Sequence, residues 1–190
     1  PTLPILMDLS LFGIQGCGKG THAKILAAEF DYDIFGAGSQ MRRVAAQDTE
    51  TGRMVKKHTD AGDLVPVEVV MQVTADWLKE HASRKVIFDG IPRSMEQLEH
   101  FNKIVEDSGR TLMGVHIVLS EDAAFDRIMK RASGRIDDAT EGSIRRRLQI
   151  FRETTMPVIE WYRERHAMVD IDGDGPIEEV YANIKKALAL

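Results

Sequence analysis

The sequence has a single cysteine, Cys17, among its 190 residues. One cysteine excludes an internal disulfide and the cysteine cluster of a structural zinc site. Long hydrophobic runs are also absent, because no apolar stretch approaches the roughly 20 residues that span a membrane. The apolar stretch near the N-terminus is interrupted by Pro4 and Asp8, unlike a signal peptide. We therefore expect a cytoplasmic protein that does not bind membranes.

An excess of basic residues is missing as well. The chain carries 25 Lys and Arg against 30 Asp and Glu, a formal net charge of -5, whereas a general nucleic-acid-binding protein has a basic balance. The charge is reversed locally, as expected around a site for a small anion. The reversal is in residues 127–152, whose basic residues include Arg127, Lys130, Arg131, Arg135, Arg145, Arg146, Arg147 and Arg152.

Repeats, linkers and low-complexity tracts are absent too. A length of 190 residues suits one domain with a sizeable core. Hydrophobic residues at 43% and charged residues at 29% are ordinary for a globular protein. We expect one domain over residues 1–190, with room for small mobile insertions.

The most informative segment is residues 9–21, LSLFGIQGCGKGT, an apolar run that ends in a glycine-rich loop. Its glycines are Gly13, Gly16, Gly18 and Gly20. They allow a tight turn that aims backbone N–H groups into one concavity, and Lys19 would reach the β and γ phosphates of a nucleoside triphosphate. The hydroxyl that usually follows the lysine comes one residue late, at Thr21. We therefore expect Mg²⁺ to be held mostly by nucleotide phosphates and water.

Two questions about this loop stay open from the residues alone. A glycine-rich turn between a strand and a helix could have only a structural role, although a lysine framed by ordered glycines favours phosphate binding. Cys17, inside the loop at a helix N-terminus, could be a reactive thiol or a small inert residue.

Hydrophobic periodicity predicts an α/β fold in which strands and helices alternate. Strands are expected at residues 5–12, 34–35, 85–88, 112–119 and 167–171. Helices are expected at residues 19–30, from about 39, at 54–61, 67–78, 94–106, 121–131, from about 141 and at 177–188. Pro157 should kink or restart the helix that begins near residue 141.

An acid and an arginine, Asp89 and Arg93, follow the third expected strand in the segment DGIPRS. Ligands of open α/β sheets bind at the carboxyl ends of the strands. Arginine side chains bind phosphate bidentately, so a set that converges from several segments would suit phosphoryl transfer. The candidates are Arg42, Arg93, Arg127, Arg131, Arg135 and Arg147.

Taken in this order, the motifs resemble those of the adenylate kinases, within the nucleoside monophosphate kinases. GIQGCGKGT is similar to their phosphate loop, GDLVP to the segment that borders the base of the monophosphate, and DGIPR to D-G-[FY]-P-R. RIMKR, GRIDD and RRRL are similar to their lid arginines. The resemblance covers nearly the whole chain.

The resemblance implies a three-layer P-loop fold with a five-stranded parallel sheet. It implies a monophosphate-binding segment at residues 36–66 and a short lid at residues 132–140. The implied activity is the Mg²⁺-dependent reaction ATP + AMP ⇌ 2 ADP, carried out by a monomer. Only three residues separate Arg131 from Arg135, which is the short form of the lid, and with one cysteine it can hold no zinc.

The resemblance also implies the residues that bind each substrate. On the ATP side they are Gly16, Cys17, Gly18, Lys19, Gly20, Thr21, Arg127, Arg131 and Gly175. On the AMP side they are Ala37, Arg42, Asp63, Leu64, Val65, Gly90, Ile91, Pro92, Arg93, Gln97, Arg135 and Arg147. The implied catalytic residues are Lys19, Arg93, Arg127, Arg131, Arg135, Arg147 and Asp89. Asp89 would orient Mg²⁺ through water.

Three positions depart from the usual adenylate kinase pattern. Ala37 and Ser39 replace the threonine and aspartate of S-T-G-D, and Ile91 replaces the aromatic residue of D-G-[FY]-P-R. Ala37 is typical of UMP/CMP kinases, which are the nearest alternative. Gln97 favours AMP, because its amide can both donate to and accept from an adenine edge. Ser94 and Gln97 also fit a helix capping box.

Two further classes fit the sequence less well. A P-loop GTPase needs an N-K-x-D motif, and the only Asn-Lys pair, Asn102-Lys103, continues with Ile104 and Val105. A non-catalytic nucleotide-binding relative should have lost phosphate-binding arginines, and none is missing from the sequence.

Overall fold

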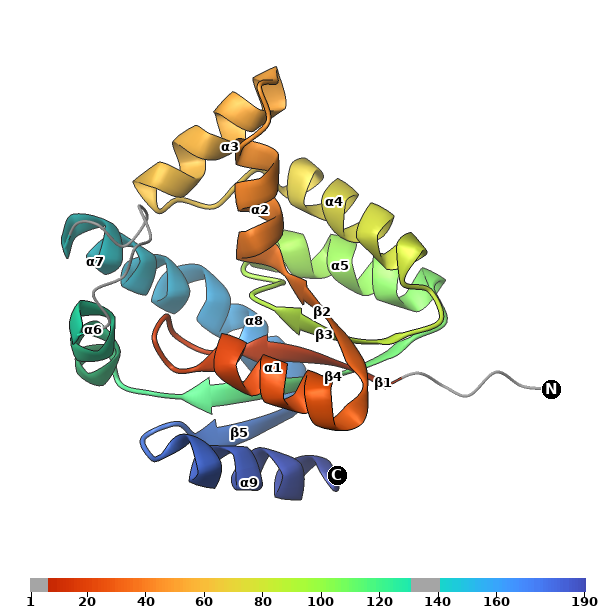
Figure 1. Cartoon of the computed structure of the whole chain (residues 1–190), viewed down its shortest axis with the longest axis vertical. Coiled ribbons are helices and arrows are strands. Elements are labelled where there is room, and N and C mark those ends of the chain that lie inside the picture. Colours follow the sequence, from red (N-terminus) through yellow and green to blue (C-terminus); the bar gives the residue numbers. More distant parts are fainter. Residues whose placement is uncertain (1–6, 131–140) are drawn as a thin grey trace.

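The computed structural model describes residues 7–130 and 141–190, and a parallel five-stranded sheet forms its centre (Figure 1). The strands are β1 (Met7–Phe12), β2 (Tyr32–Gly36), β3 (Lys85–Asp89), β4 (Thr111–Val118) and β5 (Met168–Asp172). Their order is β2-β3-β1-β4-β5. The expected α/β fold is confirmed. Because successive strands are added on both sides of β1, its carboxyl end lies at a topological switch point, where ligands of such sheets bind.

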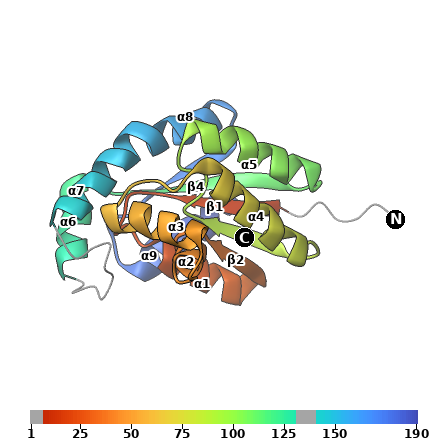
Figure 2. The ribbon, with the colours of Figure 1, turned by 90° about the horizontal axis from the view of Figure 1, so that it is seen from above.

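Helices cover both faces of the sheet and give three layers (Figure 2). One face is covered by α1 (Lys19–Phe30) and α9 (Ile177–Leu188). The other is covered by α4 (Val67–Glu80), α5 (Met95–Asp107) and α8 (Met156–Glu164). No helix in the described part of the chain is long and apolar enough to cross a membrane.

Four further helices stand near the carboxyl ends of the strands (Figure 1). They are α2 (Ala37–Ala45), α3 (Glu50–Ala61), α6 (Glu121–Lys130) and α7 (Glu141–Ile150). α3 begins four residues before its expected start because Thr49 caps it, its side chain accepting from the Gly52 N–H at 2.9 Å. These helices surround the edge of the sheet where the phosphate loop lies.

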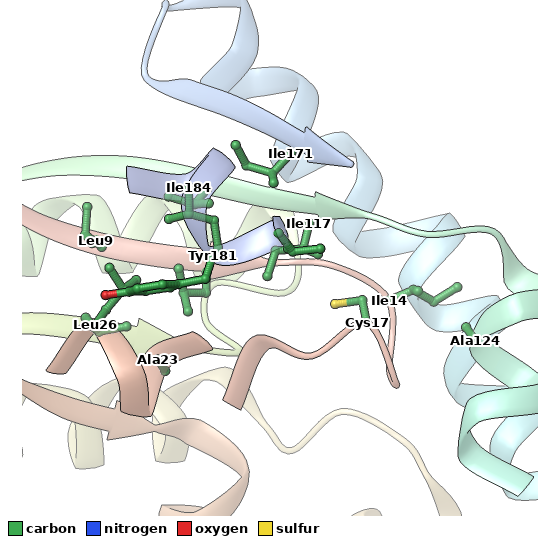
Figure 3. Close-up of a cluster of buried hydrophobic side chains, with 14 of the residues drawn as sticks. Leu9, Ile14, Cys17, Ala23, Leu26, Ile117, Ala124, Ile171, Tyr181 and Ile184 are labelled. Carbon is green, nitrogen blue, oxygen red and sulfur yellow. The ribbon is translucent and has the colours of Figure 1, made fainter. Parts of the chain in front are cut away.

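The face under α1 and α9 is filled by aliphatic side chains (Figure 3). Leu9 of β1 and Ile117 of β4 pack with Leu26 of α1 and Ile184 of α9, and all four are fully buried. Burying such a side chain typically stabilises the fold by about 2 kcal/mol. This cluster holds α1, and with it the phosphate loop, firmly on the sheet.

A buried ion pair lies at the end of the sheet where β1 and β4 begin, opposite to the phosphate loop. Both oxygens of the Asp8 carboxylate accept from Nη1 of Arg110, at 2.9 and 2.8 Å, and Asp8 Oδ1 also accepts from the Val86 N–H at 2.8 Å. Arg110 donates through Nη2 to the carbonyls of His81 and Ala82. The polar residue that interrupts the first apolar run is therefore a cross-link between β1, β3 and the start of β4.

The helical region after residue 141 is divided into three parts. α7 ends at Ile150, residues Phe151–Thr155 form a π-helical turn, and α8 begins at Met156. Pro157 lies in the first turn of α8, directly after the π-helical turn. The sequence predicted a kink or a restart at Pro157. The backbone at Ile150, Thr155 and Met156 is helical, so the helix continues through this region, and the π-helical turn was not predicted.

Candidate active site

The loop between β1 and α1 has the backbone geometry of an anion-binding site. Gly13 and Gly16 have φ of +149° and +89°, conformations that residues with a Cβ rarely adopt. A Cβ on Gly13 would lie 2.7 Å from the carbonyl oxygen of Ile117, and one on Gly16 would lie 3.1 Å from that of Ala124. The loop is thus packed tightly against β4 and α6. It leads directly into the N-terminus of α1, which favours negative charge.

Lys19 is folded over this loop. Its Nζ donates to the carbonyl oxygens of Gly13 at 2.5 Å and Ile14 at 3.2 Å, and to Sγ of Cys17 at 3.7 Å. Within residues 7–130 and 141–190, no carboxylate forms an ion pair with Lys19. Its positive charge is therefore held by neutral acceptors, which leaves it available to a phosphate.

Cys17 is only 2% exposed, and its sulfur is directed into the buried cluster under α9 (Figure 3). Reactive cysteines lie in partially exposed positions. The burial of Cys17 favours the interpretation that it is a small inert residue.

A cavity of about 990 Å³ extends from the phosphate loop to α2 and α3. The predicted residues that line it are Gly16, Gly18, Lys19, Gly20, Thr21, Ala37, Arg42, Asp63, Leu64, Val65, Asp89, Gly90, Pro92, Arg93, Gln97 and Arg147. Residues predicted to bind ATP and residues predicted to bind AMP therefore face one continuous space.

The segment after β3 is held in place from two sides. Ser10 Oγ donates to the carbonyl of Ile91 at 2.6 Å, and Thr155 Oγ1 donates to the carbonyl of Arg93 at 3.0 Å. Arg93 Nε donates back to the carbonyl of Gly90 at 2.7 Å. The Ile91-Pro92 peptide bond is cis. These contacts place Arg93 at the wall of the cavity.

Asp89, at the end of β3, faces the start of α1. A Cβ built on Gly20 would lie 3.6 Å from Oδ2 of Asp89, in ordinary van der Waals contact, so the carboxylate lies directly beside the start of α1. Carboxylate oxygens are ligands or outer-shell partners that suit Mg²⁺. Among the described residues, no three of His, Cys, Asp and Glu are grouped so that they could hold a metal ion.

Gln97 takes part in the cap of α5. Ser94 is the N-cap residue and accepts from the Gln97 N–H at 3.2 Å, while Gln97 Oε1 accepts from the Arg93 N–H at 2.8 Å. Gln97 is 3% exposed and lines the cavity. Its amide oxygen thus has a structural partner already, and the predicted contact with an adenine base stays a prediction.

The far wall of the cavity joins α7 to the end of α3. Gly62, which ends α3 with φ of +76°, contacts α7 so closely that a Cβ would lie 3.2 Å from Cγ of Arg147. Arg146 Nε donates to Asp63 Oδ1 at 2.9 Å. Asp63, predicted to border AMP, is therefore paired with an arginine 83 positions away.

A second cavity, of about 200 Å³, adjoins the phosphate loop beside α9. Three residues predicted for the ATP side, Cys17, Arg127 and Gly175, line this cavity and not the larger one. Arg127 Nη2 donates to the carbonyl of Gly173 at 3.2 Å and to Asp174 Oδ1 at 3.4 Å. His22, which was not among the predicted site residues, also lines this cavity.

Three other predicted residues lie elsewhere. The Ile91 side chain is fully buried in the cluster under α4 and α5, so only its backbone can border a ligand. Arg131, Arg135 and the expected lid at residues 132–140 lie outside the described residues.

Two residues of the site, Ser10 and Thr155, were not predicted. Both are buried and act on backbone carbonyls distant in the sequence, 81 and 62 positions away. The one available signal was a hydroxyl inside a buried strand, in the case of Ser10.

Comparison with known proteins agrees with this arrangement. The family model described as adenylate kinase matches residues 11–167. An adenylate kinase of Thermus thermophilus is 36% identical over 181 residues, which cover 94% of this chain and 95% of that protein. Those of Corynebacterium glutamicum strain R and Maricaulis maris are each 36% identical, over 184 and 186 residues. The match covers 96% of this chain in both cases, and 99% and 98% of these two relatives.

Proposed function

The chain belongs to the adenylate kinase family, a family of phosphotransferases that catalyse ATP + AMP ⇌ 2 ADP. We propose that AMP and the triphosphate of ATP meet in the larger cavity, and that the nucleoside part of ATP occupies the smaller one. The main support is the continuous cavity of about 990 Å³. In it, the phosphate-loop lysine faces the same space as arginines from three other segments. These residues are Lys19, Arg42, Arg93 and Arg147.

On the donor side, the phosphate loop would hold the triphosphate of ATP. Backbone N–H groups of residues 16–21 and the Lys19 ammonium suit this role, because both are donors to anionic oxygens. Arg127 and Gly175 would border the nucleoside part of ATP in the smaller cavity. The proximity of that cavity to Gly16 and Gly18 supports this division.

On the acceptor side, residues 36–66 would form the AMP-binding segment. Arg42 and Arg93 would bind the AMP phosphate, since guanidinium groups bind phosphate oxygens in a fork. The base would lie near Ala37, the backbone of residues 63–65 and Gln97. The backbone of residues 90–92 would complete this side.

Transfer on this site would need no general base. The attacking oxygen belongs to a phosphate that is already ionised, so the protein has to align the two phosphate chains and neutralise charge that develops between them. Lys19, Arg93, Arg127 and Arg147 would supply this charge. Arg131 and Arg135, assigned by resemblance, would join them from the lid.

Adenylate kinases use Mg²⁺ with ATP. Here the nucleotide phosphates and water would supply most of its ligands, and Asp89 would orient it through water. The carboxylate of Asp89 beside Gly20 fits this role. Bound there, Mg²⁺ would neutralise charge on the transferred phosphoryl group.

The form that we propose is a monomer in the cytoplasm. Both sides of the proposed site come from one chain, so the site does not need a second copy. The net charge of -5 supports substrates that are small nucleotides and not nucleic acid.

A coupled assay with ATP and each of AMP, UMP, CMP and GMP would test the function. AMP should give the highest kcat/KM. Equal or higher values with UMP or CMP would favour the UMP/CMP kinase alternative, and no ADP formation with any acceptor would contradict the proposed reaction.

A further inference from the structure

His22 is a buried histidine at the smaller cavity. It lies in the first turns of α1, three residues after Lys19, and is 3% exposed. Its ring is parallel to that of Tyr181 in α9, with an angle of 5° between the planes and 6.4 Å between the centroids. This packing fixes the ring between α1 and α9, with one edge at the cavity.

The two ring nitrogens of His22 have different surroundings. Nδ1 is fully enclosed and has no hydrogen-bond partner in the described part of the chain, whereas Nε2 is not enclosed in this way. The edge that carries Nε2 lies beside the phosphate loop, since a Cβ built on Gly18 would be 3.5 Å from Nε2. Nε2 therefore lies on the side of the ring that a ligand can approach.

Burial lowers the pKa of His22, so the ring is neutral at physiological pH and carries one proton. An enclosed N–H without an acceptor is rarer in proteins than an enclosed acceptor without a donor. The proton therefore belongs on Nε2. His22 presents an N–H donor at the cavity.

The smaller cavity suits part of a ligand. Its volume of about 200 Å³ is below the range of roughly 300 to 1,000 Å³ that is typical of pockets for whole drug-sized ligands. Ile177 and Val180 are apolar residues that line it, and Arg127 lines it as well. A planar purine matches these surroundings, because it is apolar on its faces, stacks on guanidinium groups and has acceptor nitrogens in its ring plane.

We propose that the Nε2–H of His22 donates a hydrogen bond to a ring nitrogen of the purine of the donor nucleotide, which makes His22 a specificity-determining residue on the ATP side. The proposal rests on the proposed function, in which the triphosphate of ATP occupies the phosphate loop. It adds a side-chain donor to a cavity that Arg127 and Gly175 also line.

The test is calorimetric binding of ATP and of 1-deaza-, 3-deaza- and 7-deaza-ATP to the full chain with Mg²⁺ and no AMP. Each analogue replaces one ring nitrogen with C–H. Wild type should bind one of the three about fivefold more weakly than ATP, the factor that one neutral hydrogen bond typically supplies. Equal affinity for all three analogues and ATP would overturn the proposal.

Two variants of His22 form a matched pair. His22→Gln places an amide N–H near the position of Nε2 and should keep the discrimination, whereas His22→Asn reaches only the position of Nδ1 and should lose it. His22→Met gives the same test if His22→Asn does not fold. Tyr181→Phe, which keeps the stacked ring, should leave the discrimination unchanged. A variant without a donor at Nε2 that still discriminates would overturn the proposal.

Formation of ADP from ATP and AMP is measured on the same wild-type preparation. Discrimination among the analogues without ADP formation would contradict the proposed function but support the role of His22. ADP formation without discrimination among the analogues would support the proposed function but contradict the role of His22.

Discussion

Among single residues, Lys19 combines a charge at the phosphate loop with little contribution to packing. It donates to two loop carbonyls, so Lys19→Met should lower the free energy of unfolding by only about 1 kcal/mol. Turnover should fall by about 10² to 10³, the effect of removing one preorganised donor at developing charge. Steady-state kinetics and urea unfolding measure the two quantities.

Lys103→Met is the matched control, because Lys103 is an exposed residue of α5 paired with Asp107. It should change neither turnover nor stability appreciably. A Lys19→Met enzyme with more than about a tenth of wild-type turnover would contradict the assignment of Lys19.

Base choice depends on Gln97, which also caps α5. Gln97→Ala should lower kcat/KM for AMP about five- to tenfold relative to UMP, because a buried group that loses its partner discriminates strongly. The KM for ATP should hardly change, since the two nucleotides occupy separate sites. Kinetics with both acceptors measure the ratio.

Ser94→Ala separates the two roles of Gln97. It removes the N-cap acceptor of the Gln97 N–H and should lower stability by about 1 kcal/mol, with base preference unchanged. A loss of AMP preference in Ser94→Ala would mean that Gln97 affects base choice only through the cap of α5.

Ala37→Thr should sharpen the preference for AMP by about 1 kcal/mol.

The residues of the site were predictable where a motif fixes the backbone. The spacing of the phosphate loop predicts Gly13 and Gly16, because only glycine readily adopts the backbone conformations of the loop. The same motif predicts Lys19. Ser10 and Thr155 were not predictable, because each donates to a carbonyl that only the tertiary fold brings near. His22 looked like an ordinary helical position, since burial and the lack of a partner at Nδ1 among the described residues cannot be read from the sequence.

Among elements, the π-helical turn Phe151–Thr155 has a direct connection to the acceptor side. Its last residue, Thr155, donates to the carbonyl of Arg93 at 3.0 Å. Thr155→Val keeps the shape but removes this bond, so Arg93 should lose orientation. We expect kcat/KM for AMP to fall about fivefold, one hydrogen bond's worth, with the KM for ATP unchanged.

The neighbouring residue is a matched control. Thr154 Oγ1 donates to the carbonyl of Ile150 within the same helical region, so Thr154→Val should leave AMP kinetics unaltered. If both variants behaved alike, the turn itself and not the Thr155 bond would be responsible.

The sequence predicted the type of most elements and located their ends less well. Strands β3 and β4 differ from the expected ranges by one residue at one or both ends, because apolar runs between breakers mark buried parallel strands. The π-helical turn has no such signature, since it preserves helical periodicity on either side. The early start of α3 depends on the cap at Thr49, a residue type that is common at helix starts.

At the scale of the whole molecule, the alternation of strands and helices predicted the α/β class, and the resemblance to the adenylate kinases implied the five-stranded parallel sheet that the structure contains. The shared cavity was not predictable, because it depends on how α7 meets the end of α3. That contact includes the Arg146–Asp63 ion pair and the close approach of Arg147 to Gly62. Exposed pairs of this kind contribute little stability, typically 0 to about 1 kcal/mol. Hydrophobic periodicity gives no sign of them, because it reports only which face of a helix is buried.

The stability of the whole molecule should depend on pH through its buried histidines. His116 of β4 is 6% exposed, with Nδ1 2.8 Å from Asp170 Oδ1. Burial lowers its pKa, Arg163 and Lys19 act in the same direction, and Asp170 opposes them. Burial also lowers the pKa of His22. Both rings are therefore neutral in the folded protein at a pH where they already bind protons in the unfolded chain.

Because the unfolded chain binds more protons below its histidine pKa of about 6.5, stability is fully present above that pH and is lost as the pH falls through it. The free energy of unfolding should therefore decrease from about pH 7 to about pH 5. His116→Gln should reduce this slope, whereas His100→Gln, at an exposed position of α5, should not. Urea unfolding across this range gives the slopes, and equal slopes in wild type and His116→Gln would show that His116 does not carry the dependence.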